Sequence, residues 1–551
     1  YIKNLEDHVA YLENLLAFHG VRDVGTSSPT DLPRANPSLA PTTQLFDHGP
    51  DVMDGQVLAN SLQTGSFSRE FAGQSGLSLL RSLLSGPIGL VSQTVKPLNG
   101  RSIADELPQQ ICTSMPPQEV VRKLTEAYFE HSDFFSPIML SKSDFLSSTE
   151  ELHDDISAAS QHHINAKFQA MMVFAIAVLL LNRTDPSVPM ARSEAYFNAA
   201  VELVSGSPDL TCTGNLDHLA NLLLVVQDCS FSSNLAGAWH FVGLATRLAI
   251  ELGLHQANPA SAGQSAHQVS QRRWLFWSTY VLERNLCVVT GRPFSIPDES
   301  ISVSLPTVEE SDPRRALAVH MIECRRLESE IYATLHYHSS PNGAVLDRSA
   351  WRENMRQRLV AWHDSVPALE YTSQLAPAGT FDGMFYINLV QLYYPSQHLP
   401  SHSASDLAML SRSAIETVNC YKHSFRAGEL RFYWRTVHNL FRSGMAAVYC
   451  TRGSRLQPDA QVDLNGLANS IQSCCSLLWG MVERYPAARA YRDIFENVVD
   501  SLNDRNEHQE PAGPLYQDLN LAGTSSQMID VLSWDIMPTP SLNQYENNPD
   551  S

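Results

Sequence analysis

The 551-residue sequence predicts an all-α protein that contains a large multi-helix domain. From about residue 107 to residue 510, apolar residues recur at helical spacing, and turn-forming residues separate the periodic stretches. Runs with the alternating pattern of a β-strand are scarce over the same range. We therefore expect a helical domain at 107–510, preceded by a short coiled coil and a disordered linker, and followed by a disordered acidic tail.

The first element, residues 1–19, has the pattern of a short coiled coil. Five apolar residues follow one another in steps of three and four, and they are the candidate dimerisation residues: Ile2, Leu5, Val9, Leu12 and Leu16. Ile or Val at the first heptad position with Leu at the fourth favours a parallel two-stranded form. Because two heptads are too short to associate strongly alone, an amphipathic helix docked on its own domain is the alternative.

The second element, residues 20–106, is predicted to be a low-complexity linker. Pro29, Pro33, Pro37 and Pro41 recur there among Ser and Thr residues. Such a composition buries too little apolar surface to offset the entropy lost on ordering. Since the chain begins with Tyr1 rather than Met, we also expect native sequence upstream of it.

The helical domain divides into thirteen predicted helices with polar or glycine- and proline-containing connections. They are Pro117–Phe129, Asn165–Asn182, Ser193–Val204, Leu216–Val226, Leu235–Leu252, Gln271–Val289, Arg314–Leu335, Trp351–Val366, Gly383–Tyr394, Ser405–His423, Phe432–Cys450, Asp463–Trp479 and Ala487–Val499. The longest apolar run, Phe168–Leu181, has the length of a buried core helix and is too short to cross a bilayer. No membrane association is expected.

The last element, residues 511–551, mixes acidic and bulky apolar residues. Residues 501–551 contain eight acidic side chains and one basic side chain, a net charge of −7. Leu532, Trp534 and Ile536 lie among these acids and are candidate anchors for a coactivator groove, which makes the tail a possible activation segment. A disordered tail without this role, or a tail that packs back on the domain, is the alternative.

Charge and cysteine content exclude several classes of protein. The formal net charge of −20 opposes binding to nucleic acid phosphates by this chain. Nine scattered cysteines, with no CxxC pair, indicate reduced thiols in a cytosolic or nuclear compartment.

The sequence has no nucleophile elbow, phosphate-binding loop, dinucleotide fingerprint or HExxH motif, so we do not expect an enzyme and assign no catalytic residue.

Two stretches within 236–306 carry the most specific pattern. In "AWHFVGLATRLAIELGLH", small residues, among them Gly243, are expected to let a neighbouring helix approach closely, and Gly253 fits the left-handed position that ends a helix. In "QRRWLFWSTYVLERNLCVVTGRPFSIPDESISVSLP", an extended strap follows a helix that ends near Gly291. Trp274 and Trp277 are interpreted as core residues, with nearby arginines paired to acids, rather than as stacking platforms for nucleic acid.

In order and spacing, these residues resemble the middle regulatory region of the fungal binuclear zinc-cluster transcription factors. The matching signature residues are Trp239, Gly243, Arg247, Gly253, His255, Arg272, Arg273, Trp277, Gly291, Arg292 and Pro293. The resemblance covers roughly residues 107–394, and Glu283 stands where the family usually has Asp. It implies a regulatory role for the helical domain and a dimerising coiled coil at residues 1–19.

The resemblance also implies a function for the whole protein. In the family, a six-cysteine zinc cluster reads DNA, and a linker and short coiled coil follow it. No cysteine precedes Cys112, so neither a zinc ligand nor a DNA-binding residue is assigned in this chain, and zinc is expected only in the native full-length protein. The resemblance implies a nuclear, homodimeric RNA polymerase II regulator, an activator, with coactivators and a small-molecule effector as partners. The alternative is a helical scaffold or metabolite-binding protein without direct transcriptional activation.

Overall fold

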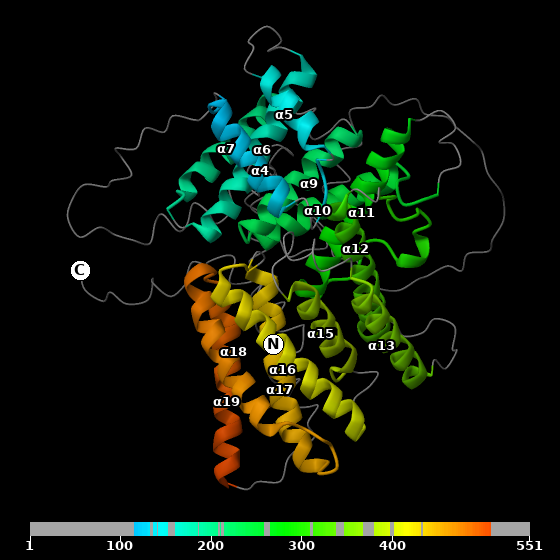
Figure 1. The fold of residues 1–551 in the computed structure, drawn as a ribbon, viewed down its shortest axis with the longest axis vertical. Coiled ribbons are helices and arrows are strands. Elements are labelled where there is room, and N and C mark those ends of the chain that lie inside the picture. The colour runs from blue at the N-terminus through cyan, green and yellow to red at the C-terminus, as the bar shows by residue number, and fades with distance from the viewer. Residues whose placement is uncertain are drawn as a thin grey trace, which may run out of the picture. The chain divides into compact units, whose positions relative to one another are not determined.

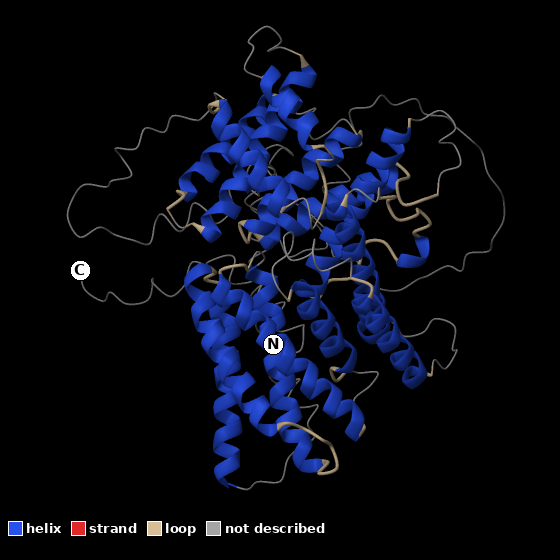
Figure 2. Cartoon of the chain, in the orientation of Figure 1, coloured by secondary structure: helices blue, strands red, loops and turns tan. Residues whose placement is uncertain are grey.

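The protein is all-α over the residues that its computed structural model describes. These are residues 115–508 apart from short gaps at 133–135, 140, 153–159, 186, 208–209, 211–213, 258–264, 309–311, 338–346, 367–378, 397–401 and 431–432. They form fourteen α-helices and no β-strand (Figures 1 and 2). The predicted coiled coil, the linker and the acidic tail lie outside the described residues.

The first half of the described chain contains eight of these helices. They are α4 (Gln118–His131), α5 (Lys142–Glu151), α6 (Gln161–Thr184), α7 (Met190–Gly206), α9 (Leu216–Phe231), α10 (Leu235–Glu251), α11 (Ala266–Thr290) and α12 (Pro313–Tyr332). A short 3-10 turn, η6 (Asp298–Ser300), interrupts the extended segment between α11 and α12.

The second half contains six helices. They are α13 (Arg348–Asp364), α15 (Thr380–Tyr393), α16 (Ala404–Ala427), α17 (Tyr433–Leu456), α18 (Leu464–Arg484) and α19 (Ala488–His508). A π-helical turn, η7 (Ala333–Tyr337), extends α12. Among these, α16 to α19 pack side by side (Figure 1).

All thirteen predicted helices are present, with ends that differ by up to nine residues, as at the end of α19, and α5 is the helix that the prediction missed. The sequence of α5, KSDFLSSTEE, has only Phe145 and Thr149 buried, so it lacks a long apolar stripe. The Ser141 hydroxyl instead caps it by accepting the Asp144 N–H at 3.1 Å.

The helix-end signals of α10 and α11 act as predicted. Gly253 and Gly291 have φ angles of 64° and 62°, the left-handed conformation that glycine adopts without strain. The N-terminus of α11 is fixed by a capping box between Ser265 and Gln268. The two helices of the signature segment therefore start and stop at defined positions.

Two buried apolar clusters hold the helices together. The first is built around α6, whose residues from Ala170 to Ala177 are at most 1% exposed, and it includes α4, α7, α9, α10 and α11. The second is centred on α15, and α12, α13, α16 and α17 also contribute to it. Helices α12, α16, α17 and α18 contribute side chains to both clusters, so they join the two cores.

Helix α6 is long and apolar enough to cross a membrane by length and composition, over Gln161–Arg183. Of its most apolar window, 67% is buried inside the protein. Its packing against α4, α7 and α9 is that of a central core helix.

Two glycines on helices have opposite surroundings. A Cβ at Gly444 on α17 would lie 2.7 Å from the Phe495 ring on α19 and 3.2 Å from the Cys474 Sγ on α18. The expectation that Gly243 lets a neighbouring helix approach closely is wrong, because a Cβ there would find no atom within 4 Å. The other small residues for which close packing was expected, Ala238, Ala245 and Ala249, are buried.

We predict that Gly444→Ala lowers the free energy of unfolding by ~1–3 kcal/mol, because the new methyl group forces α17 away from α19. Gly243→Ala is the matched control on another helix, and it should stabilise the protein by ~0.5–1 kcal/mol through reduced backbone entropy. Urea denaturation of the two variants measures both effects. Equal effects of the two substitutions would contradict the packing described here.

Candidate functional site

The signature segment 236–306 forms one connected unit of α10, α11 and the strap, residues 292–306. The strap lies against the end of α10, where the backbone N–H groups of Ser302 and Val303 donate to the His255 carbonyl oxygen at 2.9 and 3.1 Å. It also lies against α11, where the Trp277 indole N–H donates to the Ser304 carbonyl oxygen at 3.0 Å. The predicted strap is thus tied to both helices that flank it in sequence.

A buried guanidinium group is the centre of this unit. Arg284 on α11 is fully buried, and its Nη2 donates to the Ile296 carbonyl oxygen at 2.6 Å and to the Asp298 Oδ1 at 3.0 Å. Its Nε donates to the Ser329 Oγ on α12 at 2.9 Å. One side chain therefore connects α11, the strap and α12.

Glu283, the neighbour of Arg284, completes this arrangement. Its carboxylate pairs with Arg284 and accepts the backbone N–H of Ser295 in the strap at 2.6 Å. The thiol of Cys287 also donates to it, at 3.4 Å. Since Glu283 is 1% exposed, both charges are compensated inside the protein rather than by water.

Two tryptophans of the segment, Trp274 and Trp277, are core residues, as predicted. Trp274 and Trp277 are 4% and 2% exposed, so they cannot stack on nucleic acid bases. Trp239 is half-buried, and the Arg292 guanidinium covers its ring at 3.9 Å from the centroid. The interpretation of these aromatic side chains as packing residues is confirmed.

The other signature residues occupy different places. Arg272 donates to the Leu252 carbonyl oxygen at 2.8 Å, which ties α11 to the end of α10, whereas the prediction paired it with an acid. Arg284 does pair with acids, as predicted. Arg273 is half-buried, and Arg247 and Pro293 are exposed. Most of the signature therefore shapes the joint between α10, the strap and α11.

A second group of polar side chains lies between α12, α15 and α17, and the sequence analysis did not identify it. We call it the buried polar centre. Its members are Arg325, Glu328, Asn388, Gln391, Arg435, His438 and Asn439. The sequence signal was available, because Arg325 and Glu328 interrupt the apolar face of a buried helix at helical spacing.

Glu328 is the hub of the buried polar centre. Its carboxylate, which is 0% exposed, accepts hydrogen bonds from Arg325 on the same helix and from Arg435 on α17. The Gln391 Nε2 on α15 donates to it at 3.3 Å. Burial alone would raise the pKa of Glu328, but the two guanidinium groups outweigh it and hold the pKa at about 2. Glu328 is therefore charged at neutral pH.

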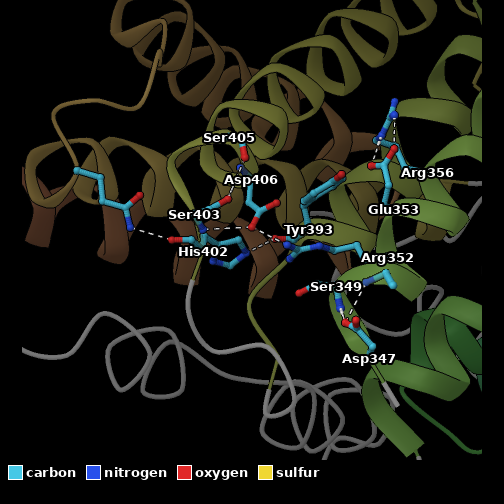
Figure 3. Close-up of polar contacts among 12 residues, drawn as sticks. Asp347, Ser349, Arg352, Glu353, Arg356, Tyr393, His402, Ser403, Ser405 and Asp406 are labelled. Atoms are coloured by element: carbon cyan, nitrogen blue, oxygen red, sulfur yellow. Dashed lines mark hydrogen bonds and ion pairs between the residues drawn. The ribbon is translucent and has the colours of Figure 1, made fainter. Parts of the chain in front are cut away.

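A third polar group joins α13, α15 and α16 (Figure 3). Arg352 on α13 pairs with Asp406, whose carboxylate also closes the capping box of α16 with Ser403 (Figure 3). The His402 ring lies between the Tyr393 carbonyl oxygen at 2.6 Å and the Tyr449 hydroxyl at 2.9 Å. Each polar atom of His402 has a partner, so this group is a structural connection.

No metal site is found among the described residues, where no three His, Cys, Asp or Glu side chains come together. The seven cysteines that the structure describes are free thiols, and burial raises the pKa of several, including Cys420 to about 11. The predicted dimerisation residues of 1–19 and the activation residues Leu532, Trp534 and Ile536 lie outside the described part of the chain.

Comparisons with known proteins identify the central part of the chain. Residues 125–364 match the family described as fungal specific transcription factor domain. The positive regulator of purine utilization of Emericella nidulans is 22% identical over 76% of this chain and 50% of its own length. The pyrimidine pathway regulatory protein 1 of Saccharomyces cerevisiae is 25% identical over 58% of this chain and 38% of its own length.

Protein STB5 of Saccharomyces cerevisiae is 23% identical over 70% of this chain and 55% of its own length. The chain thus spans about half, or less, of the length of the curated relatives that it matches. The match of residues 125–364 includes the whole signature segment.

We predict that Arg284→Met lowers the free energy of unfolding by ~3–5 kcal/mol, because it leaves the Glu283 carboxylate buried without its partner. The double variant Glu283→Gln with Arg284→Met should recover part of this loss. Guanidinium chloride denaturation measures both changes.

Arg122→Met is the matched control, since it removes an exposed arginine on α4, and it should change stability by less than ~0.5 kcal/mol. An equally small effect of Arg284→Met would show that the strap is not held by this side chain.

Proposed function

Because residues 125–364 are a fungal specific transcription factor domain, we propose that this protein is a sequence-specific regulator of RNA polymerase II transcription that acts as an activator. The family match is the observation that carries the proposal, and the relatives named as regulators of purine utilization and of the pyrimidine pathway support it. In this proposal the protein works in the nucleus, and the helical domain controls its activity.

We assign DNA contact to a zinc cluster of the full-length protein rather than to any residue of this chain. The net charge of −20 argues against phosphate contact by the chain itself. The first cysteine is Cys112, and the described residues hold no group of metal ligands. Zinc would fold that cluster and position its basic residues, and no step is assigned to it here.

Dimerisation is proposed to reside in residues 1–19. The seam of Ile2, Leu5, Val9, Leu12 and Leu16 fits a parallel pair of helices, which would place two DNA-binding modules side by side.

We predict that Leu5→Ala together with Leu12→Ala raises the dimer dissociation constant by at least ~10-fold, because both side chains would leave the apolar seam. Sedimentation equilibrium of the full chain measures this constant. The matched control is Asn4→Ala with Tyr11→Ala, which changes two outward positions at the same spacing. A wild-type chain that remains monomeric would favour the alternative, a helix docked on its own domain.

Activation is proposed to reside in the tail, through Leu532, Trp534 and Ile536. Acidic neighbours keep such apolar anchors in solution until a coactivator groove buries them.

We predict that alanine at these three tail positions lowers reporter transcription by at least ~10-fold when the full chain is fused to a heterologous DNA-binding module. The loss reflects removal of the apolar anchors, and alanine at Ser541, Asn543 and Gln544 is the control within the same tail. Unchanged reporter output in the first variant would instead support a scaffold role without direct activation.

A metabolite-binding role is the second candidate function, and the buried polar centre favours it. Several of its polar atoms have no hydrogen-bond partner among the described residues. In a regulator, such a site would be the place where an effector acts on the helical domain.

A further inference from the structure

We propose that the buried polar centre between α12, α15 and α17 binds a small organic anion that also carries N–H or O–H donors. The effector role of this ligand rests on the proposed function, whereas the binding itself is inferred from the contacts of the site. The open hydrogen-bonding atoms, the charge of the centre and its place between the two cores support the proposal.

Three buried amide side chains leave their oxygen atoms without a partner. The NH2 groups are used: Gln391 donates to Glu328 at 3.3 Å, and Asn439 donates to the Tyr421 hydroxyl at 2.6 Å. Asn388 donates to a carbonyl oxygen within α15 at 2.7 Å. All three carbonyl oxygens lack a hydrogen bond, although the residues are at most 1% exposed. The centre is therefore short of hydrogen-bond donors, which a ligand can supply.

His438 on α17 adds a ring with two open nitrogen atoms. The residue is 9% exposed, and neither nitrogen has a hydrogen-bond partner. Burial, together with the charges of Arg442 and Arg435, lowers the pKa of His438 to about 3, so the ring is neutral at physiological pH. A neutral imidazole offers one donor and one acceptor. His438 can therefore donate one hydrogen bond to a polar ligand and accept another from it, and its ring adds no positive charge to the centre.

The charge of the centre favours an anion. Arg325 and Arg435 share the single carboxylate of Glu328, so two positive charges face one negative charge, a balance of +1. The Nε of Arg325 also has no hydrogen-bond partner. A carboxylate on the ligand would balance the excess charge in a region of low dielectric.

A buried amide elsewhere in the protein, Gln227, has a hydrogen-bond partner for each of its side-chain polar atoms. Gln227 on α9 is 1% exposed, and its Oε1 accepts the Tyr128 hydroxyl at 2.9 Å. Its Nε2 donates to the Ser136 carbonyl oxygen and hydroxyl at 2.9 and 2.8 Å. Unmatched amide oxygens also occur at Asn285 and Gln457, so what distinguishes the polar centre is that three of them share one group with the two open nitrogen atoms of His438.

The position of the centre would let a bound ligand act on the whole domain. Helices α12 and α17 belong to both apolar clusters, and α15 belongs to the second. A ligand that contacts all three helices favours the arrangement in which they converge on it. Binding would therefore shift the relative positions of the two cores, which is what an effector of a regulator requires.

The experiment is thermal unfolding of the full chain with ureidoacetate, which carries a carboxylate and urea N–H donors. Acetate and N-methylurea each supply one half of this chemistry and are the control probes. With about 10 mM of each probe, we expect ureidoacetate to raise Tm by at least ~1 °C more than either control. Gln391→Met and His438→Phe should each abolish that difference, since each removes an open polar group.

Gln227→Met is the matched control variant, because it removes a buried amide whose atoms all have partners. It should lower Tm but keep the response to ureidoacetate. The absence of a specific response in the wild-type chain, or an equal response in all variants, would overturn the inference. Reporter activation without a ureidoacetate response would overturn this inference alone, whereas a ureidoacetate response without reporter activation would overturn the proposed function alone.

Discussion

The charge of one buried carboxylate constrains the arrangement of the helical domain. Glu328 is removed from water, and its charge is compensated because Arg325 lies one turn earlier on α12 and Arg435 is brought to it by α17. Removing either arginine would leave an uncompensated charge in the interior, which is among the costliest changes a core can suffer. Since α12 and α17 are two of the four helices that contribute to both apolar clusters, this contact links helices on which the junction of the two cores depends.

The signature segment also contains a buried ion pair that is compensated by other protein groups. Arg284 and Glu283 bring a buried charge pair to the strap, and backbone groups of Ile296 and Ser295 complete their hydrogen bonds. Apolar packing alone does not specify the path of an irregular segment, whereas directional bonds to a fixed pair do. Polar connections between apolar helices are therefore a recurring feature of this domain. In one of them, the buried polar centre, several side-chain atoms have no hydrogen-bond partner among the described residues.

Much of the fold could be predicted from the sequence because helices are encoded locally. Apolar spacing identified thirteen helices, and Gly253 and Gly291 marked two of their ends. Helix α5 was missed because its stability depends on a cap and few apolar contacts. The polar centre was missed because Glu328 and Arg435 are 107 positions apart, and no local pattern pairs them. Gly243 was misread since a small residue does not reveal whether a neighbour is present.

The account is tested most directly by the pH dependence of unfolding in the wild-type chain and in Glu328→Gln. The pKa of Glu328 is lowered from 4.5 to about 2 in the folded protein, so its contribution to stability is present above pH 4.5 and is lost as the pH falls toward 2. We therefore predict that the stability advantage of the wild type over the variant shrinks as the pH falls through this range. A difference in unfolding free energy that stays constant with pH would contradict the central role of the Glu328 charge.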